Sequence, residues 1–140
     1  MRLLPRYFEK RVSSVEVTRF IFSKKHYKAS QRRAKLAAFL PPPKYSELSV
    51  YQNGLQIEEM FRVGDKFVGA YRSPPRKVKA CAVLDVCSVE GLEQNPRLKV
   101  LSWPKPHHLH ANIKPFPIDK ALRRHIAHML SEIASVEFRA

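Results

Sequence analysis

The segment from Val78 to Val89 is the feature that most limits the folds open to this chain. Its residues alternate between the two faces of an extended strand, and both faces are largely apolar. A strand with two apolar faces needs cover on both, so we expect it inside a sheet. Asp85 is the exception in this segment. Burying an unpaired carboxylate costs several kcal/mol, so we expect Asp85 to have a cation, a hydrogen-bond network or a functional role.

Four shorter segments combine β-branched or aromatic residues with alternation at period two, which is typical of strands. They are residues 15–22, 47–51, 98–103 and 110–113. Asn53-Gly54 marks a turn after the second of them. Prolines punctuate several of the connections, which predicts short links between these strands.

Three segments have the composition or spacing of helices. Residues 23–40 are rich in Lys, Arg, Ala and Gln and stop at three consecutive prolines, which cannot continue a helix. Residues 55–62 place apolar side chains at positions i, i+3 and i+4, and Gly64 is placed to end that helix. Residues 118–134 repeat apolar side chains at helical spacing and predict an amphipathic helix that docks on the rest of the domain.

Strands and helices are interspersed without a regular βαβ rhythm. This order predicts an α+β fold, with a small mixed or antiparallel sheet and helices packed mainly on one face. The chain has 140 residues, so we expect residues 1–140 to form a single domain whose basic N-terminal segment, about 1–44, is partly an arm. No run approaches the roughly 18 apolar residues of a membrane span. We therefore expect a cytoplasmic protein with no membrane association.

Cys81 and Cys87 are expected to be free thiols. They lie six residues apart in a strand-like segment, which separates them by nearly 20 Å, far beyond the reach of a disulfide.

The positive charge of the chain is concentrated near its beginning. The net charge is +14, and residues 1–44 hold twelve Lys or Arg against two acids. Such a concentration repels itself in a compact protein, and a partner that carries phosphates would relieve the repulsion and release counterions. We therefore expect a nucleic acid, RNA or DNA, as the partner.

The cations of residues 23–40 would form one stripe if that segment were helical, and Tyr27 is placed to stack on unpaired bases. A second basic group surrounds the Pro74-Pro75 corner, and its position relative to the first does not follow from the sequence. Together they make up the predicted nucleic-acid-binding residues: Lys24, Lys25, Tyr27, Lys28, Arg32, Arg33, Lys35, Arg72, Arg76 and Lys77.

His110 and Asn112 form the second candidate site, because they face the same side of a predicted strand. A histidine there suits acid–base chemistry, such as metal-independent RNA cleavage, with Glu47 or Asp85 as the orienting or acidic partner. A purely structural histidine is the alternative. His108 shares that face, and His26, His125 or His128 is a conceivable third metal ligand. Nothing in the sequence fixes that third ligand, so no metal site is predicted. Glycine-rich phosphate-binding motifs are also missing from the sequence, and we expect no cofactor.

Four short segments resemble a pattern in small, uncharacterised bacterial proteins. They are Arg19–Ser23, Ala38–Pro41, Glu47–Val50 and His110–Ile113, and the similarity would cover most of residues 19–133. The resemblance implies a bacterial, intracellular origin and no particular activity. It also singles out a set of polar residues on strands, where a small-sheet protein would mount a pocket: Glu47, Ser49, His110 and Asn112.

Three functions remain open on the sequence. The first is a nucleic-acid-binding accessory module, or a subunit of a larger protein or ribonucleoprotein complex, that contacts phosphates through the basic N-terminal third. The second is a small enzyme that acts on nucleic acid or nucleotide at His110 and Asn112. The third is an interaction subunit that docks on an acidic protein partner. The charge asymmetry favours the first, which is not enzymatic.

Overall fold

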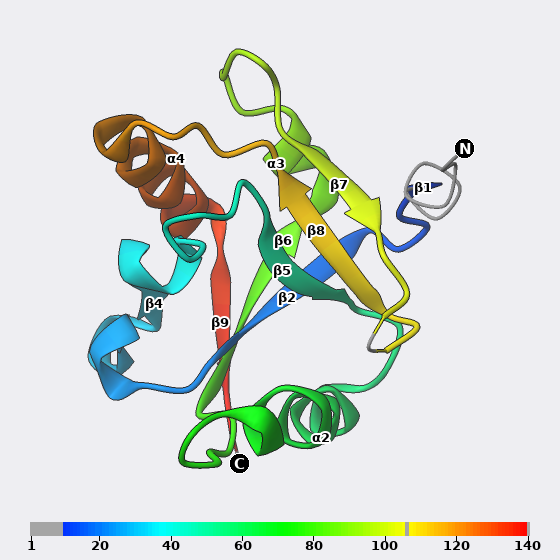
Figure 1. Cartoon of the computed structure of the whole chain (residues 1–140). Helices are drawn as coiled ribbons and strands as arrows, with labels where there is room; N and C mark the ends of the chain where they lie inside the picture. Colours follow the sequence, from blue (N-terminus) through cyan, green and yellow to red (C-terminus); the bar gives the residue numbers. More distant parts are fainter. Residues whose placement is uncertain (1–9, 106, 140) are drawn as a thin grey trace.

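The computed structural model describes residues 10–105 and 107–139, and it has the predicted α+β architecture. Seven strands form one antiparallel sheet in the order β1-β7-β8-β5-β2-β6-β9 (Figure 1). These strands are β1 (Lys10–Arg11), β2 (Glu16–Ile21), β5 (Leu48–Gln52), β6 (Ala80–Asp85), β7 (Lys99–Ser102), β8 (His110–Lys114) and β9 (Ser135–Phe138). A separate two-stranded ladder consists of β3 (Tyr27–Lys28) and β4 (Arg33–Ala34).

Three α-helices and four short 3-10 helices accompany the sheet in the described residues. The α-helices are α2 (Ile57–Phe67), α3 (Val86–Glu90) and α4 (Lys120–Ile133). The 3-10 helices are η1 (Lys24–His26), η2 (Ala29–Gln31), η3 (Leu36–Phe39) and η4 (Gly69–Tyr71). Among the described residues, no helix has the length and apolar character needed to cross a bilayer.

Each face of the sheet has its own apolar cluster. On one face, Val17 and Val50 are buried beneath Ile126 and Leu130 of α4 in a cluster that also takes in residues of α3 and η3. On the other face, a smaller cluster joins side chains of the sheet to α2: Phe20, Tyr51 and Cys81 with Met60 and Phe61. The larger share of helical cover therefore lies on one face, while α2 lies on the other (Figure 1).

The predicted strands at 15–22, 47–51, 98–103 and 110–113 correspond to β2, β5, β7 and β8. The strand predicted over residues 78–89 is confirmed in β6, which lies inside the sheet between β2 and β9. Its predicted end is wrong, because residues 86–90 form α3. Asp85 is exposed rather than buried, and its carboxylate accepts a hydrogen bond of 2.9 Å from the backbone N–H of Ser88 at the start of that helix. A cap of this kind satisfies an otherwise unpaired N–H group and explains the aspartate.

The long helix expected over residues 23–40 does not form. The chain instead passes through η1, β3, η2, β4 and η3, and Arg32 adopts the left-handed conformation with φ 50°, which interrupts any helix. Tyr27 lies in extended backbone, and its ring packs 5.3 Å from that of Phe138 on β9. Packing of this segment against α4 and β9 outweighs its helical composition, which is a weak determinant of structure.

Gly64 does not end α2 as expected, since the helix runs on to Phe67. The glycine allows α2 to lie close to the sheet. A β-carbon at this position would come within 2.5 Å of Val78 Cγ2 and 2.8 Å of Phe20 Cδ1. The smallest residue is needed here for packing rather than for a turn.

The cysteines are free thiols, as predicted. Cys81 is buried in β6, whereas Cys87 is exposed on α3.

Candidate functional site

The ladder between β2 and β5 is short, and this opens the sheet. The two strands pair only at Val17 with Gln52 and at Thr18 with Tyr51. From there β5 continues along β8, while β2 continues along β6. The backbone of Ser49 thus loses its neighbour on the β2 side, and the side chain of Arg19 takes its place.

The guanidinium of Arg19 bridges the opening. Its Nη1 donates a hydrogen bond of 2.8 Å to the carbonyl oxygen of Ser49, and its Nε donates one of 2.9 Å to the carbonyl oxygen of Ala38. Burial, followed by the nearby charge of Arg72, lowers the pKa of Arg19 to about 10. Within the described residues Arg19 forms no salt bridge, so carbonyl dipoles rather than a carboxylate face its charge.

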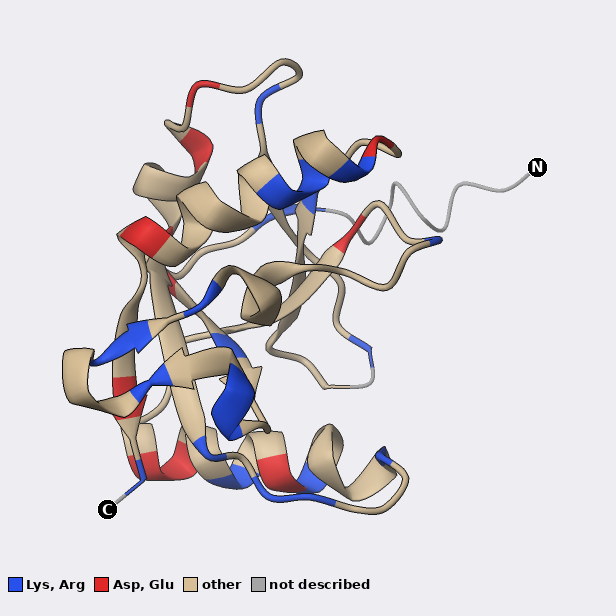
Figure 2. Ribbon diagram, turned by 90° about the vertical axis from the view of Figure 1, so that its left-hand side faces the viewer, with Lys and Arg blue, Asp and Glu red and all other residues tan. Residues whose placement is uncertain are grey.

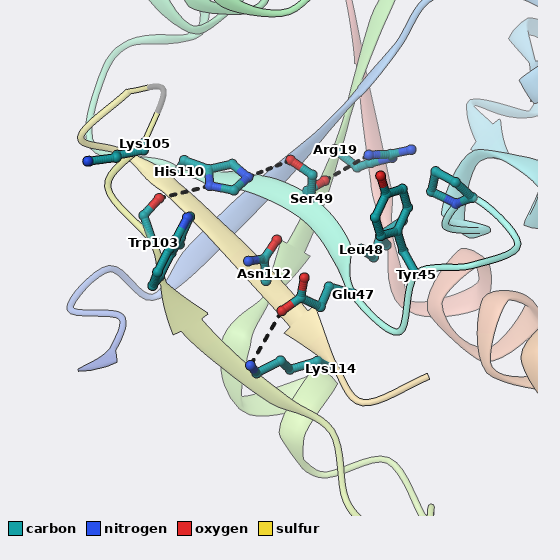
Figure 3. Close-up of a pocket in the computed structure, with 11 residues that line it drawn as sticks. Arg19, Tyr45, Glu47, Leu48, Ser49, Trp103, Lys105, His110, Asn112 and Lys114 are labelled. Atoms are coloured by element: carbon teal, nitrogen blue, oxygen red, sulfur yellow. Dashed lines mark hydrogen bonds and ion pairs between the residues drawn. The ribbon is translucent and has the colours of Figure 1, made fainter. Parts of the chain in front are cut away.

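A hollow of about 790 Å³ opens where β2 and β5 diverge (Figure 3). Side chains from β5, β8 and the segments leading into β5 and out of β7 line it. The lining residues are Arg19, Pro42, Tyr45, Glu47, Leu48, Ser49, Trp103, Lys105, His110, Asn112 and Lys114. The predicted residues Glu47, His110 and Asn112 therefore come together in one pocket, as does Ser49, which the resemblance had singled out.

Ser49 and His110 form the closest polar pair in this pocket. Ser49 lies opposite Asn112 in the register of β5 and β8, so its side chain shares a face with His110 two residues earlier on β8. Ser49 Oγ lies 2.7 Å from His110 Nε2, and His110 Nδ1 lies 2.8 Å from the carbonyl oxygen of Trp103. Because a carbonyl oxygen can only accept, Nδ1 carries the ring proton and donates it to Trp103. The neutral Nε2 then accepts a hydrogen bond from the hydroxyl of Ser49.

His110 is 8% exposed, and this burial lowers its pKa below the ordinary value of 6.5. The hydrogen bond to Trp103 and the charge of Glu47 oppose the shift without cancelling it. The imidazole is therefore neutral at pH 7, with its basic nitrogen directed at a hydroxyl. This is the arrangement in which a histidine can take a proton from a serine.

Glu47 and Lys114 lie across the pocket from this pair, and their charged atoms are 3.4 Å apart. The amide of Asn112 lies between the ion pair and Ser49 (Figure 3).

The sequence did not predict Arg19, Tyr45 or Trp103 as residues of this pocket. A signal for Arg19 was present, since alternation along residues 15–22 places this cation on the same face as two core residues.

None of the predicted nucleic-acid-binding residues lines this pocket. Lys28 and Arg33 lie on the β3–β4 ladder, whose cations are coloured in Figure 2. Arg72 lies nearer the site, because it lines a small neighbouring hollow together with Arg19 and Ser49. Lys24 lines a hollow of about 400 Å³ together with Arg76, Lys77 and Lys79. The two basic groups, far apart in sequence, therefore meet. The Lys79 N–H donates a hydrogen bond of 2.8 Å to the Ile21 carbonyl oxygen and so joins the segments of the two groups. Within the second segment, the Arg76 N–H donates one of 3.0 Å to the Gly69 carbonyl oxygen.

We define the basic surface as the exposed cations of the two groups other than Arg32: Lys24, Lys25, Lys28, Arg33, Lys35, Arg72, Arg76, Lys77 and Lys79. The salt bridges between described residues use none of them. Arg32 and Tyr27 are engaged differently. Arg32 Nη2 donates to the carbonyl oxygen of Val136 at 3.2 Å, and Tyr27 is half-buried against Phe138.

The histidines near the pocket do not assemble a metal site. His107 and His108 stack with ring centroids 4.3 Å apart, and burial, with a contribution from His108, lowers the pKa of His107. In the described part of the chain, no group of three or more His, Cys, Asp or Glu side chains could hold a metal ion.

No protein-family model, curated protein or solved structure matches this chain.

Proposed function

We propose that this protein binds nucleic acid through the basic surface. The observation that carries the proposal is the convergence of Lys24 with Arg76, Lys77 and Lys79 around one hollow. Two basic groups that are about fifty residues apart in sequence thus contribute cations to one hollow. No salt bridge among the described residues neutralises these cations, so an external polyanion is the natural counterion.

The geometry suits phosphates better than base edges. The surface is built of short 3-10 turns, a two-stranded ladder and a proline corner, and none of these elements is a long helix that would enter a major groove. Lysine and arginine side chains on such a surface follow a phosphate backbone and carry little sequence information. We therefore propose binding that depends strongly on salt and weakly on sequence.

Fluorescence anisotropy with labelled 20-nucleotide RNA, single-stranded DNA and duplex DNA tests this proposal across a potassium chloride series. The informative variant reverses two charges of the basic surface, Lys24→Glu with Lys77→Glu. The control, Arg97→Glu with Arg124→Glu, makes the same change in net charge at exposed positions outside that surface.

We expect the first variant to lose about tenfold or more in affinity and to flatten the log–log salt slope by about 2, one for each phosphate contact removed. The control should retain most of the affinity and the slope. Equal losses in the two variants would show that net charge alone drives binding. A wild-type slope near zero would exclude phosphate contacts and favour docking on an acidic protein.

A further inference from the structure

We propose that the pocket between β2 and β5 is a second functional site, in which Ser49 is the nucleophile of an ester hydrolase and His110 is its base. Ser49, His110 and Asn112 do not belong to the basic surface, and neither proposal requires the other. Its chemistry follows from the contact of Ser49 Oγ with His110 Nε2 and from the Trp103 carbonyl oxygen at His110 Nδ1, which fixes the tautomer.

The arrangement has the three parts that a serine nucleophile needs. The base lies within hydrogen-bond distance of the hydroxyl, at 2.7 Å. A third group, the Trp103 carbonyl, orients the base from the other side at 2.8 Å. The hydroxyl itself lines an open hollow of about 790 Å³, so a substrate carbonyl can reach it.

The reaction proceeds in two balanced steps. In the first, Ser49 Oγ bonds to the ester carbonyl carbon, and its proton passes to His110 Nε2. The bond from that carbon to the alcohol oxygen then breaks, and the alcohol leaves with the proton from Nε2. In the second, water attacks the acyl-serine and gives a proton to Nε2. The bond from Oγ to the acyl carbon breaks, Nε2 returns the proton to Oγ, and the carboxylic acid departs.

Asn112 is the donor best placed to stabilise the negative oxygen that forms during each attack. It lies directly opposite Ser49 in the β5–β8 register, and its side chain faces the same pocket. No hydrogen bond joins its amide to another described side chain, which leaves the N–H groups available to a ligand. An amide donor of this kind commonly contributes about 10² to 10³ in rate.

The charges in the pocket indicate the class of ester. Glu47 is neutralised by Lys114, whereas Arg19 and Lys105 have no salt-bridge partner among the described residues. The pocket is thus positive overall, and Tyr45 and Trp103 supply flat apolar walls. We assign to it a carboxylic ester that carries one further anionic group, a carboxylate or a phosphate.

Covalent labelling distinguishes a nucleophile from a serine that merely satisfies a buried histidine. The folded protein is treated at pH 8 with a biotinylated fluorophosphonate, and the modified residue is located by peptide fragmentation. Ser49→Ala and His110→Gln are compared with Ser102→Ala, which removes a partly exposed serine on β7 outside the pocket. Circular dichroism establishes that each variant is folded.

We expect the probe on Ser49 in the wild type and in Ser102→Ala, no label at this position in Ser49→Ala, and labelling at least about tenfold slower in His110→Gln. Absence of label on Ser49 in the folded wild type would overturn the proposal. Labelling of His110→Gln at the wild-type rate would overturn it as well, because His110 would then not activate the serine.

Substrate preference tests the charge argument separately. Initial rates are compared for 4-nitrophenyl acetate and for the mono-4-nitrophenyl ester of succinate, which carries a carboxylate. We expect the wild type to favour the succinate ester and Lys105→Ala to lose most of that preference. Equal rates on the two esters in the wild type would overturn the assignment of an anionic substrate.

Discussion

The guanidinium of Arg123 donates a hydrogen bond of 3.1 Å to the carbonyl oxygen of Pro41, which lies 82 residues earlier in the chain. The same side chain donates to the carbonyl oxygens of Pro42, Tyr45 and Pro117. One buried arginine on α4 thereby holds the proline segment that leads into β5. Since Pro42 and Tyr45 line the pocket, the shape of the site depends on a residue that does not line it.

Replacing Arg123 by Met should lower the free energy of unfolding by about 2–4 kcal/mol, because the side chain is 7% exposed and four carbonyl groups lose a charged donor. Urea denaturation followed by circular dichroism measures the change. Arg124→Met, at the exposed neighbouring position, is the matched control and should stay within about 0.5 kcal/mol of wild type. Equal losses in the two variants would contradict the role assigned to Arg123.

Gly69→Ala should displace the proline corner that carries Arg76 and Lys77 of the basic surface. A β-carbon at this position would lie 1.9 Å from the carbonyl oxygen of Arg76, so the Pro74-Pro75 corner must move. We expect a loss of about 1–3 kcal/mol in stability, typical of overpacking, together with weaker binding of labelled RNA. In Gly54→Ala the new β-carbon would lie 3.7 Å from its nearest neighbour, Leu109 Cδ2, which is an ordinary van der Waals distance. That control should bind as wild type does, and equal behaviour of the two variants would contradict this account.

The imidazole of His110 should titrate below pH 6.5, because burial lowers its pKa. The neutral form is favoured in the folded state, so the resulting contribution to stability is complete above pH 6.5 and is lost as pH falls towards the folded-state pKa. Two-dimensional NMR of the histidine side chains measures the midpoint, and His110→Gln assigns the signal. A midpoint above 6.5 would contradict the burial argument.

The pair of Asp65 and Arg139 should make the attachment of β9 sensitive to acid. Burial acts to raise the pKa of Asp65, but hydrogen bonds from Arg139 and from the Val78 N–H outweigh it and lower the pKa. The contribution to stability is therefore complete above the ordinary value of about 3.9 and is lost as pH falls through the folded-state pKa. Asp65→Asn should remove this part of the pH dependence in urea titrations between pH 7 and pH 3. Glu93→Gln, an exposed position, is the control and should keep it.

The strands were predictable where apolar and polar residues alternate along the sequence and the apolar ones are buried in the structure. Residues 15–22 and 110–113 show this pattern clearly, and both are strands. The helix predicted over residues 23–40 is wrong because composition alone favours it. The observed structure of this segment includes the left-handed Arg32 and a contact of Tyr27 with Phe138. That contact depends on a residue about 110 positions away in the chain. Strand β9 escaped prediction for a related reason, since it forms by pairing with β6 rather than through a strong pattern of its own.

The candidate pocket was predictable in part. Placing His110 and Asn112 on one strand face required only a period of two, and the β5–β8 register then brought Ser49 opposite Asn112. The partners that give the histidine its tautomer and the pocket its charge could not be deduced. The Trp103 carbonyl is a backbone atom without a side-chain signature, and Arg19 enters the site because two strands separate, which is a property of the whole sheet.

The separation of β2 from β5 has a consequence for how this protein can change over evolutionary time. A backbone ladder tolerates most substitutions, but here the side chain of Arg19 spans the opening. One codon therefore specifies both a positive charge in the cavity lining and a link between the two sides of the opening. Related chains that exchange this arginine for a shorter or neutral residue would keep the scaffold and admit different molecules.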